Sequence, residues 1–381
     1  MQQVYLKSDS IISPLGFGTM ANLRELRLQN SALKLQKPTS KYPAGYYAGM
    51  LDEEIIDRSF SLIGNCEDYT KLEKMLILAI KDVVDKEERV DSLSTGLVIA
   101  TTKGNIDLLN SNKFAKERVE LWKMAQVVAD FFGFKNKPIV VSNACISGGL
   151  AIKTAADFIK YGKFDSAIVA AGDLVSDFVL SGFQSFQAMS AKACKPFDAE
   201  RNGISLGEAA AAVFIDGQTS QEQNVEFIHA VTTNDANHIS GPSRDGEGLY
   251  QAISRLEHFT GITSEEIDAI SAHGTATIYN DEMEAIAFNR SNLNDIPMHS
   301  LKGYFGHALG ASALIESIML KHSLLNNELI ISKNFESSGV SASLNITTEA
   351  TQKKLNIALK TASGFGGCNI AMLFRKTKAH V

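Results

Sequence analysis

Cysteine is scarce in this sequence, and the positions of the few cysteines exclude two common roles. The chain of 381 residues has four of them, Cys66, Cys145, Cys194 and Cys368, and no two form a C-x-x-C pair. Thiolate zinc sites and disulfide frameworks depend on paired or regularly spaced cysteines. We therefore expect neither kind of site, and a reducing cytoplasm is the expected location of the protein.

Long apolar runs and a surplus of positive charge are also missing. No apolar stretch reaches the roughly 18 residues that a membrane-spanning helix needs. The N-terminal residues lack the charged segment and apolar run of a signal peptide. The formal net charge is −6, whereas a nucleic-acid-binding surface needs a basic surplus. We expect a soluble intracellular protein that binds neither membrane nor nucleic acid.

The chain is longer than most single folding units, because hydrophobic cores stop growing beyond roughly 250–300 residues. Its 45% hydrophobic and 21% charged residues are typical of a soluble globular enzyme. A polar segment at 216–224 is the clearest boundary in the pattern. It divides the chain into an N-terminal half, residues 1–220, and a C-terminal half, residues 221–381.

The two halves repeat one order of expected elements. The first repeated unit is a strand, a threonine-containing loop and a helix, at 96–110 and again at 267–288. The second is a strand, a reactive loop and an amphipathic helix, at 138–160 and at 296–321. The third is a small-residue strand, at 166–173 and at 356–363. Two copies of one α/β motif would explain both the length of the chain and its lack of a linker.

Cys145 lies in V-V-S-N-A-C-I-S-G-G-L-A-I-K, where a short β-branched run meets a small-residue turn and then an amphipathic helix. This pattern places the cysteine at a helix N-terminus, where free N–H groups and the helix dipole favour negative charge. Such a position lowers the pKa of a thiol from about 8.5. We therefore expect Cys145 to be a reactive nucleophile.

Two histidines of the C-terminal half also follow predicted strands. His273 comes directly after I-D-A-I-S-A, and His307 lies in K-G-Y-F-G-H-A-L-G-A, where a helix is expected to begin. Open α/β sheets bind ligands beyond the carboxyl ends of their strands. A helix N-terminus disfavours positive charge, so we expect neutral imidazoles that can donate an N–H to an oxyanion. A lone histidine is usually structural, but two in this setting favour a functional role.

Three further features accompany the histidines. Lys302 and Glu316 lie on either side of His307, and a buried lysine needs an ionic partner, so the two are expected to pair as a structural or a catalytic ion pair. The loop A-S-G-F-G-G-C-N at 362–369 is either a tight turn or an oxyanion pocket of backbone N–H groups. Within it, Cys368 is expected to be a small buried residue rather than a second nucleophile.

Together these residues resemble the β-ketoacyl-[acyl-carrier-protein] synthases, the Cys-His-His branch of the thiolase-like condensing enzymes. The resemblance covers most of the chain from about residue 90 and follows the family's order. It is carried by six stretches: S-N-A-C-I-S-G-G, K-P-F-D-A-E-R-N-G-I-S-L-G-E, N-D-A-N-H-I-S-G-P, A-H-G-T-A-T-I-Y-N-D, K-G-Y-F-G-H-A-L-G-A and G-F-G-G-C-N. The implied fold is α/β: a duplicated thiolase-like fold, a five-layered α/β/α/β/α sandwich that is usually dimeric.

The resemblance also implies roles for individual residues. Cys145 takes the acyl chain as a thioester, and His273 and His307 bind the malonyl thioester carbonyl and promote decarboxylation. Lys302 and Glu316 match the lysine and the glutamate of the family's site, and Asp281 matches an acidic residue behind the first histidine. Thr275 and Thr277 lie where the family contacts the phosphopantetheine arm. Phe365 matches the family's gating phenylalanine, whose N–H forms an oxyanion hole with that of Cys145.

The implied activity is that of a 3-oxoacyl-[acyl-carrier-protein] synthase, an acyltransferase that extends a fatty-acid or polyene-type chain by two carbons. Its partners would be acyl and malonyl forms of an acyl carrier protein, which brings the phosphopantetheine arm; the enzyme itself would hold no cofactor and no metal. Candidate residues for docking the acidic carrier are Lys113, Lys116, Arg118 and Lys123. The chain is similar to synthases of aryl-polyene or flexirubin-type pigment pathways. We expect it to form a homodimer or a heterodimer with a related subunit.

Two other functions remain open. One is a non-elongating subunit, similar to a chain-length factor, in a heterodimeric synthase; such subunits usually lose the cysteine, whereas Cys145 is retained here. The other is a coenzyme A-dependent thiolase, which uses a second cysteine in its C-terminal loop, where this chain has Cys368. The Lys302–Glu316 pair and the second G-H motif favour the synthase.

Overall fold

Two groups of strands with the same internal order form the centre of the molecule. The computed structural model of the protein describes residues 2–37, 45–218, 223–235 and 241–378. The boundary predicted between residues 220 and 221 lies outside the described residues, as does most of the N-D-A-N-H-I-S-G-P stretch. Within the described ranges, no helix combines the length and apolar character needed to cross a bilayer.

Strands and helices are interspersed along the N-terminal half. They are β1 (Tyr5–Ser13), β2 (Gly16–Phe17), α1 (Thr19–Arg27), β3 (Lys34–Gln36), β4 (Tyr46–Gly49), α2 (Glu53–Phe60), α3 (Lys71–Lys86), β5 (Thr95–Ala100), α4 (Leu121–Phe132), β6 (Ile139–Val141), α5 (Ser147–Lys160), β7 (Ser166–Asp173), α6 (Asp177–Ser185), β8 (Leu206–Gly207) and β9 (Ala209–Asp216), with short 3₁₀ helices η1 (Cys66–Asp68), η2 (Ile106–Asn110) and η3 (Lys116–Val119). Of these strands, β5, β6 and β7 are each followed by a helical segment.

The elements of the C-terminal half are β10 (Val225–Asn234), α7 (Glu247–Thr260), η4 (Ser264–Glu266), β11 (Ala269–Ser271), α8 (Ile278–Arg290), β12 (Met298–His299), α9 (Lys302–Phe305), η5 (Leu309–Ala311), α10 (Ser312–Asn326), β13 (Glu328–Leu329), β14 (Thr351–Gln352), β15 (Ile357–Gly364) and β16 (Cys368–Lys376). In this half, β10, β11 and β12 are each followed by a helix, and β13 to β16 follow one another.

Strand pairing follows the same plan in both halves. The order is β6-β5-β7-β9-β1 in the first and β12-β11-β15-β16-β10 in the second, and β1 pairs with β10 to join them. In each half the first three strands are parallel and the next two pairings are antiparallel. The repeat predicted from the sequence is therefore present, with β5, β6 and β7 matching β11, β12 and β15.

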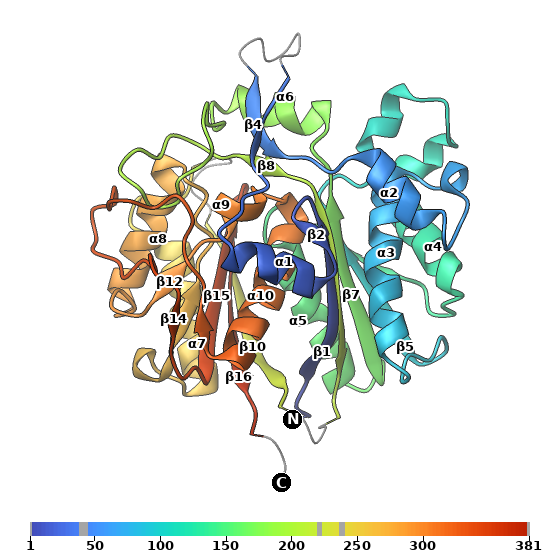
Figure 1. The fold of residues 1–381 in the computed structure, drawn as a ribbon. Coiled ribbons are helices and arrows are strands. Elements are labelled where there is room, and N and C mark those ends of the chain that lie inside the picture. Colours follow the sequence, from blue (N-terminus) through green and yellow to red (C-terminus); the bar gives the residue numbers. More distant parts are fainter. Residues whose placement is uncertain (1, 38–44, 219–222, 236–240, 379–381) are drawn as a thin grey trace.

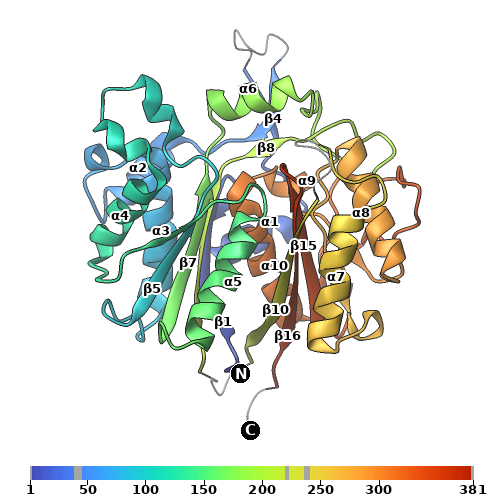
Figure 2. The same ribbon diagram turned by 180° about the vertical axis from the view of Figure 1, so that it is seen from behind.

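The layers alternate helix and strand across the molecule, which is the thiolase-like α/β/α/β/α arrangement (Figure 1). Helices α3 and α4 cover one outer face, α7 and α8 cover the other, and α5 and α10 lie between the two groups of strands, as the view from behind also shows (Figure 2). Helix α10 is buried along most of its length, because it packs between the two groups of strands and has no solvent-facing side.

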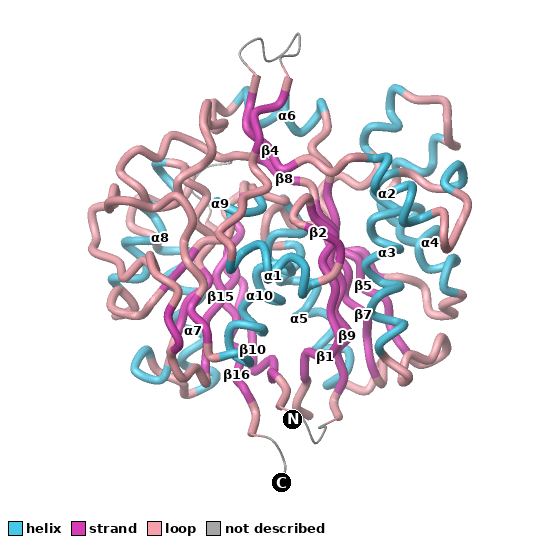
Figure 3. Tube along the Cα trace, in the orientation of Figure 1, coloured by secondary structure: helices cyan, strands magenta, loops and turns pink. Residues whose placement is uncertain are grey.

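This arrangement decides where the site can form. Strand β6 leads into α5 and strand β12 leads through α9 into α10, so the two central helices begin at equivalent positions of the two halves. Figure 3 shows α5 and α10 side by side between the strands. Residues that follow β6, β11 and β12 therefore meet at one end of the central layer.

Candidate active site

Cys145 lies in a tight turn between β6 and α5, directly before Ile146, the N-cap residue of that helix. The preceding residue, Ala144, has a φ of 44°, a left-handed conformation that costs an L-residue roughly 1–2 kcal/mol. The Ser147 hydroxyl holds the turn: its Oγ accepts the N–H of Asn143 (2.8 Å) and donates to the carbonyl of Ala144 (2.6 Å). The strained turn presents the sulfur to the central cavity.

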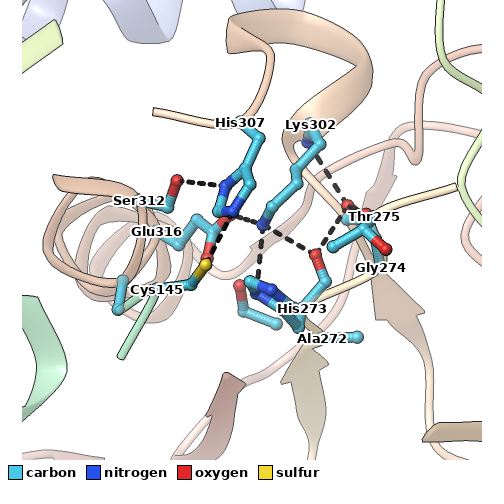
Figure 4. A network of polar contacts seen from close by, with 12 residues as sticks. Cys145, Ala272, His273, Gly274, Thr275, Lys302, His307, Ser312 and Glu316 are labelled. Carbon is cyan, nitrogen blue, oxygen red and sulfur yellow. Dashed lines mark hydrogen bonds and ion pairs between the residues drawn. The ribbon is translucent and has the colours of Figure 1, made fainter. Parts of the chain in front are cut away.

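His307 is the direct partner of the cysteine. Its Nε2 lies 2.9 Å from Cys145 Sγ, and its Nδ1 lies 3.0 Å from Ser312 Oγ (Figure 4). The backbone of His307 is fixed by the N-terminal half of the chain. Its N–H donates to the carbonyl of Ser205 (2.7 Å) and its carbonyl accepts the N–H of Gly207 (3.0 Å).

Gly306 allows this close approach of backbones. It has a φ of 75°, and a Cβ at this position would lie 2.3 Å from the carbonyl oxygen of Leu206. A side chain at residue 306 would therefore push the His307 segment away. His307 itself does not begin a helix as the sequence predicted. It lies between α9 and η5, and α10 begins only at Ser312.

His273 lies beside His307, with ring centroids 5.3 Å apart and planes at 83°. On its far side, the Lys302 Nζ lies 3.3 Å from His273 Nδ1 and donates to the His273 carbonyl (2.8 Å). The ammonium has no acceptor, so Nδ1 must accept and the ring proton is on Nε2. His273 can thus donate an N–H from the edge of the ring opposite Lys302.

The predicted pair of Lys302 and Glu316 is present: Lys302 Nζ lies 2.6 Å from Glu316 Oε1, and both side chains are buried. A second lysine, which the sequence reasoning missed, lies on the other side of the carboxylate. Lys360 Nζ is 2.9 Å from Glu316 Oε2. Its signal in the sequence was a single charged residue within the apolar strand I-A-L-K-T-A-S-G.

Two buried carboxylates from α8 shape the loop that follows β11. Glu284 accepts the N–H groups of His273 (2.8 Å) and Gly274 (2.6 Å). Asp281 accepts those of Thr275 (2.9 Å) and Ala276 (3.1 Å). Asp281 therefore holds the threonine loop, and Glu284, which the sequence reasoning missed, holds the histidine backbone. The two acids are three residues apart on a helix, a spacing that puts them on one face.

The site opens into a cavity of about 400 Å³ whose wall includes Cys145, His273 and His307. Thr275 and Thr277 line it as well, and their hydroxyls lie 2.9 Å apart. The wall combines apolar side chains such as Phe183 and Ile278 with polar ones such as Asn202 and Thr275, so it can contact a ligand that has both apolar and hydrogen-bonding parts. The roles assigned to both threonines from the resemblance stay predictions.

Phe365 lies in the glycine loop between β15 and β16, and its backbone N–H points to the sulfur of Cys145. Its ring contacts Phe183 and Phe186, with centroid distances of 5.4 and 5.1 Å. Phe183 in turn lies edge-on to His307 at 6.4 Å. Phe183 and Phe186 were not predicted from the sequence. The three rings form an apolar wall beside the nucleophile, and the role of Phe365 as a gate stays a prediction.

Burial decides the charge state of the reacting groups. It raises the pKa of Cys145 to about 12, so the prediction of a lowered thiol pKa is wrong: loss of water around the sulfur outweighs the helix N-terminus. Burial, followed by the charge of Lys302, lowers the pKa of both His273 and His307 well below their ordinary value. At neutral pH the site holds a thiol and two neutral imidazoles, as predicted for the histidines.

The same three side chains offer the nearest approach to a metal site among the described residues. One sulfur and two imidazole nitrogens lie within 4.8 Å of one another, a ligand set that zinc accepts. The Lys302 ammonium next to His273 would repel a dication, so the charge distribution favours an anionic ligand over a metal.

Arg118 and Lys113 lie outside the wall of the cavity, whereas Cys368 lies beside Cys145. Arg118 pairs with the buried Glu73 and donates to the carbonyl of Asp68, and its role in docking a carrier protein stays a prediction. Lys113 pairs with Glu67 at 3.1 Å on the surface. Cys368 is buried, and its Sγ lies 3.7 Å from the carbonyls of Asn143 and Phe365, as a small packing residue would.

Comparison with known proteins gives the family. Residues 78–220 match the model described as "Beta-ketoacyl synthase, N-terminal domain", and residues 226–336 match "Beta-ketoacyl synthase, C-terminal domain". A 3-oxoacyl-[acyl-carrier-protein] synthase 2 of Rhizobium meliloti is 27% identical, with 100% of each chain covered. A ketoacyl synthase alpha subunit for tetracenomycin from Streptomyces glaucescens is 28% identical over 65% of this chain and 62% of its own.

Solved structures agree in fold. The complex of the ketosynthase ApeO with its chain length factor ApeC from Xenorhabdus doucetiae includes a chain that aligns with a TM-score of 0.85 at 21% identity, covering 99% of this chain and 98% of the other. A chain of the ishigamide ketosynthase/chain length factor aligns with a TM-score of 0.86 at 20% identity, covering 99% and 100%.

Proposed function

This chain belongs to the β-ketoacyl synthase family, a family of condensing acyltransferases, and we propose that it is an elongating 3-oxoacyl-[acyl-carrier-protein] synthase. The observation that carries the proposal is the contact of 2.9 Å between Cys145 Sγ and His307 Nε2, with His273 beside them. A subunit that did not form an acyl-enzyme would have no need for a nucleophile next to a base.

The first half-reaction moves an acyl group from a carrier protein to Cys145. The neutral thiol gives its proton to His307 Nε2 as the sulfur attacks the thioester carbonyl, which is nucleophilic catalysis with a positioned base. The developing oxyanion accepts the N–H of Phe365, together with that of Cys145. The carrier thiol leaves and takes the proton from His307, which restores the neutral ring.

The second half-reaction uses the malonyl form of the carrier. The thioester oxygen accepts N–H bonds from His273 Nε2 and His307 Nε2, carbon dioxide leaves, and the enolate carbon attacks the acyl group on Cys145. His307 must carry its proton on Nε2 here, whereas it accepted the thiol proton at this atom before. The Ser312 hydroxyl at Nδ1 permits both tautomers, because it can donate or accept. Cys145 leaves as a thiolate and regains a proton from water.

The carrier's phosphopantetheine arm would lie in the cavity beside Thr275 and Thr277, and the enzyme itself would hold no other cofactor. The acyl chain is proposed to be of fatty-acid or polyene type. The pathway is proposed to be cytoplasmic, and pigment synthesis is one candidate for it. Relatives with 3-oxoacyl synthase and polyketide names support this range. The assembly is proposed to be a homodimer or a heterodimer with a related subunit, as in structures with a chain length factor.

Intact-mass analysis after incubation with acyl-carrier proteins of different chain lengths tests the proposal. The wild-type protein should gain one acyl group, and Cys145→Ala should gain none. Addition of malonyl-carrier should then yield a 3-oxoacyl carrier longer by two carbons. An unacylated wild-type protein would contradict an elongating role and favour the non-elongating subunit.

A further inference from the structure

Lys360 is a charged residue in the middle of a buried strand, and the mechanism above gives it no role. Its side chain has no exposed surface, and it pairs in register with Ser271 across β15 and β11. Removing an ammonium from water costs several kcal/mol unless other charges and hydrogen bonds compensate. Two sets of contacts compensate for the burial of the Lys360 ammonium.

The first contact fixes Glu316. Each oxygen of this carboxylate faces a different lysine: Oε1 lies 2.6 Å from Lys302 Nζ and Oε2 lies 2.9 Å from Lys360 Nζ. Burial alone would raise the pKa of Glu316, but the two ammonium charges outweigh it and lower the pKa. A carboxylate held from both sides cannot rotate, so Lys302 keeps its place 3.3 Å from His273 Nδ1.

The second contact fixes the end of β11. Lys360 Nζ donates to the carbonyls of Ser271 (3.2 Å) and Ala272 (3.4 Å), the two residues before His273. Glu284 takes the N–H groups of His273 and Gly274. A cation thus holds the backbone on one side of the histidine, and an anion holds it on the other.

The charges around Lys360 come from every element packed against it. Glu316 of α10 and Glu284 of α8 are its acidic neighbours, Lys302 of α9 is a like charge, and His299 of β12 lies within its field. Both active-site histidines also experience its positive charge, which adds to burial in keeping their rings neutral.

We propose that Lys360 is a positioning residue for the decarboxylation step: it fixes Glu316 and the end of β11, so that Lys302 holds His273 with its Nε2–H toward the cavity. The proposal rests on the proposed function for its kinetic consequence. Acylation of Cys145 depends on His307 and the Phe365 N–H, which Lys360 does not touch, so the two half-reactions should separate.

The kinetic test compares Lys360→Met with Lys74→Met. Lys74 is also buried and paired with carboxylates, Glu53 and Asp57, but on the outer helices α2 and α3. Lys360→Met should acylate at close to the wild-type rate and lose decarboxylation of malonyl-carrier on the order of 10²-fold, the effect of a small misplacement of a reacting group. Lys360→Arg should recover part of the loss. Lys74→Met should keep both rates.

A second measurement does not depend on the enzyme's substrate. In carbon-13 histidine NMR, the His273 signal, assigned by its loss in His273→Gln, should show a neutral ring in the wild type down to the lowest pH at which the protein is folded. In Lys360→Met the ring should become protonated at a higher pH than in the wild type, within the range where the protein is folded, because a like charge has been removed. A wild type that fails to acylate but shows this shift would refute the proposed function and support the role of Lys360.

Two results would overturn the proposal. One is an unchanged decarboxylation rate together with an unchanged His273 titration in folded Lys360→Met. The other is an equal loss of acylation and decarboxylation in that variant, with no rescue by Lys360→Arg. That pattern would mean that Lys360 only supports the general fold.

Discussion

Ser312 Oγ lies 3.0 Å from His307 Nδ1, on the opposite edge of the ring from Cys145 Sγ. Ser312 is the first residue of α10, and Cys145 lies just before the start of α5. The His307 imidazole is therefore held between the N-terminal ends of the two central helices. Because a hydroxyl can donate or accept, it can form a hydrogen bond with Nδ1 whether or not this atom carries a proton. This relationship gives the first prediction.

Replacing Ser312 by Ala should slow acylation of Cys145 by roughly 10- to 100-fold, since the imidazolium formed on proton transfer loses a hydrogen bond worth about 1.5–3 kcal/mol. Single-turnover acylation followed by intact mass measures this rate. Ser317→Ala is the matched control: its hydroxyl is buried on the same helix and donates to the carbonyl of Ala313. Equal rates in Ser312→Ala and the wild type would remove Ser312 from the mechanism.

Alkylation of Cys145 should be slow at neutral pH. Burial raises the pKa of its thiol to about 12, so the thiolate fraction is small near pH 7 and increases about tenfold for each pH unit below that pKa. The rate of modification by iodoacetamide, followed by mass spectrometry from about pH 6 to pH 9, should rise throughout. A plateau near pH 7 would show instead that the helix N-terminus dominates and that the thiol is already ionised.

Turnover should fall as the pH decreases through about 7. Burial, aided by the neighbouring Asp281, raises the pKa of Glu284 to about 7. Its ionised form accepts the N–H groups of His273 and Gly274; protonation turns one oxygen into a donor and weakens this support. Turnover should therefore be high above this pKa and should be lost as the pH falls below it.

The control for this pH effect is Glu284→Gln, whose amide cannot titrate. It should have a low kcat across the range and lack the inflection near pH 7, as a pH profile of decarboxylation would show. If the inflection persisted in the variant, another group would be responsible.

A prediction about stability concerns Asp9 of β1, which binds Lys321 and His322 of α10. Asp9→Asn should lower the free energy of unfolding by about 3–5 kcal/mol, since it leaves a buried ammonium without its partner. Asp85→Asn, which breaks an exposed pair with Lys81, should change it by about 0.5 kcal/mol or less. Urea unfolding measures both variants, and similar losses in the two would contradict the assignment.

The same pair also predicts a pH dependence. Burial opposes ionisation of Asp9, but Lys321 and His322 outweigh it and lower the pKa of the carboxyl below its ordinary value. A depressed folded-state pKa contributes stability above the unfolded value, near 3.8, and this stability is lost as the pH falls through the folded-state pKa. The difference in unfolding free energy between the wild type and Asp9→Asn should therefore shrink below about pH 4.

The sequence allowed the central part of the site to be predicted, because position relative to a strand is a local property. Cys145, His273 and His307 each follow a strand, and parallel strands of a repeated motif end at the same edge. The supporting residues could not be found in this way. The lone charge of Lys360 in an apolar strand marks it as unusual, but its role depends on partners that are distant in the chain, and Glu284 has no local pattern that shows that its carboxylate accepts the N–H groups of His273 and Gly274.

The error about the thiol has a similar cause. A helix N-terminus can be recognised in a sequence, whereas the loss of solvent around Cys145 results from packing of Phe365 and His307, which come from the other half of the chain. The repeat was predicted correctly because the order of elements is encoded locally. The direct contact between halves at β1 and β10 was not.

The hydrogen bonds between His307 and the segment Ser205–Gly207 have a consequence for how the site is assembled. The base is aligned by the copy of the motif that supplies the nucleophile, so neither copy alone contains a complete catalytic apparatus. For the same reason, separately expressed halves should regain activity only after they recombine.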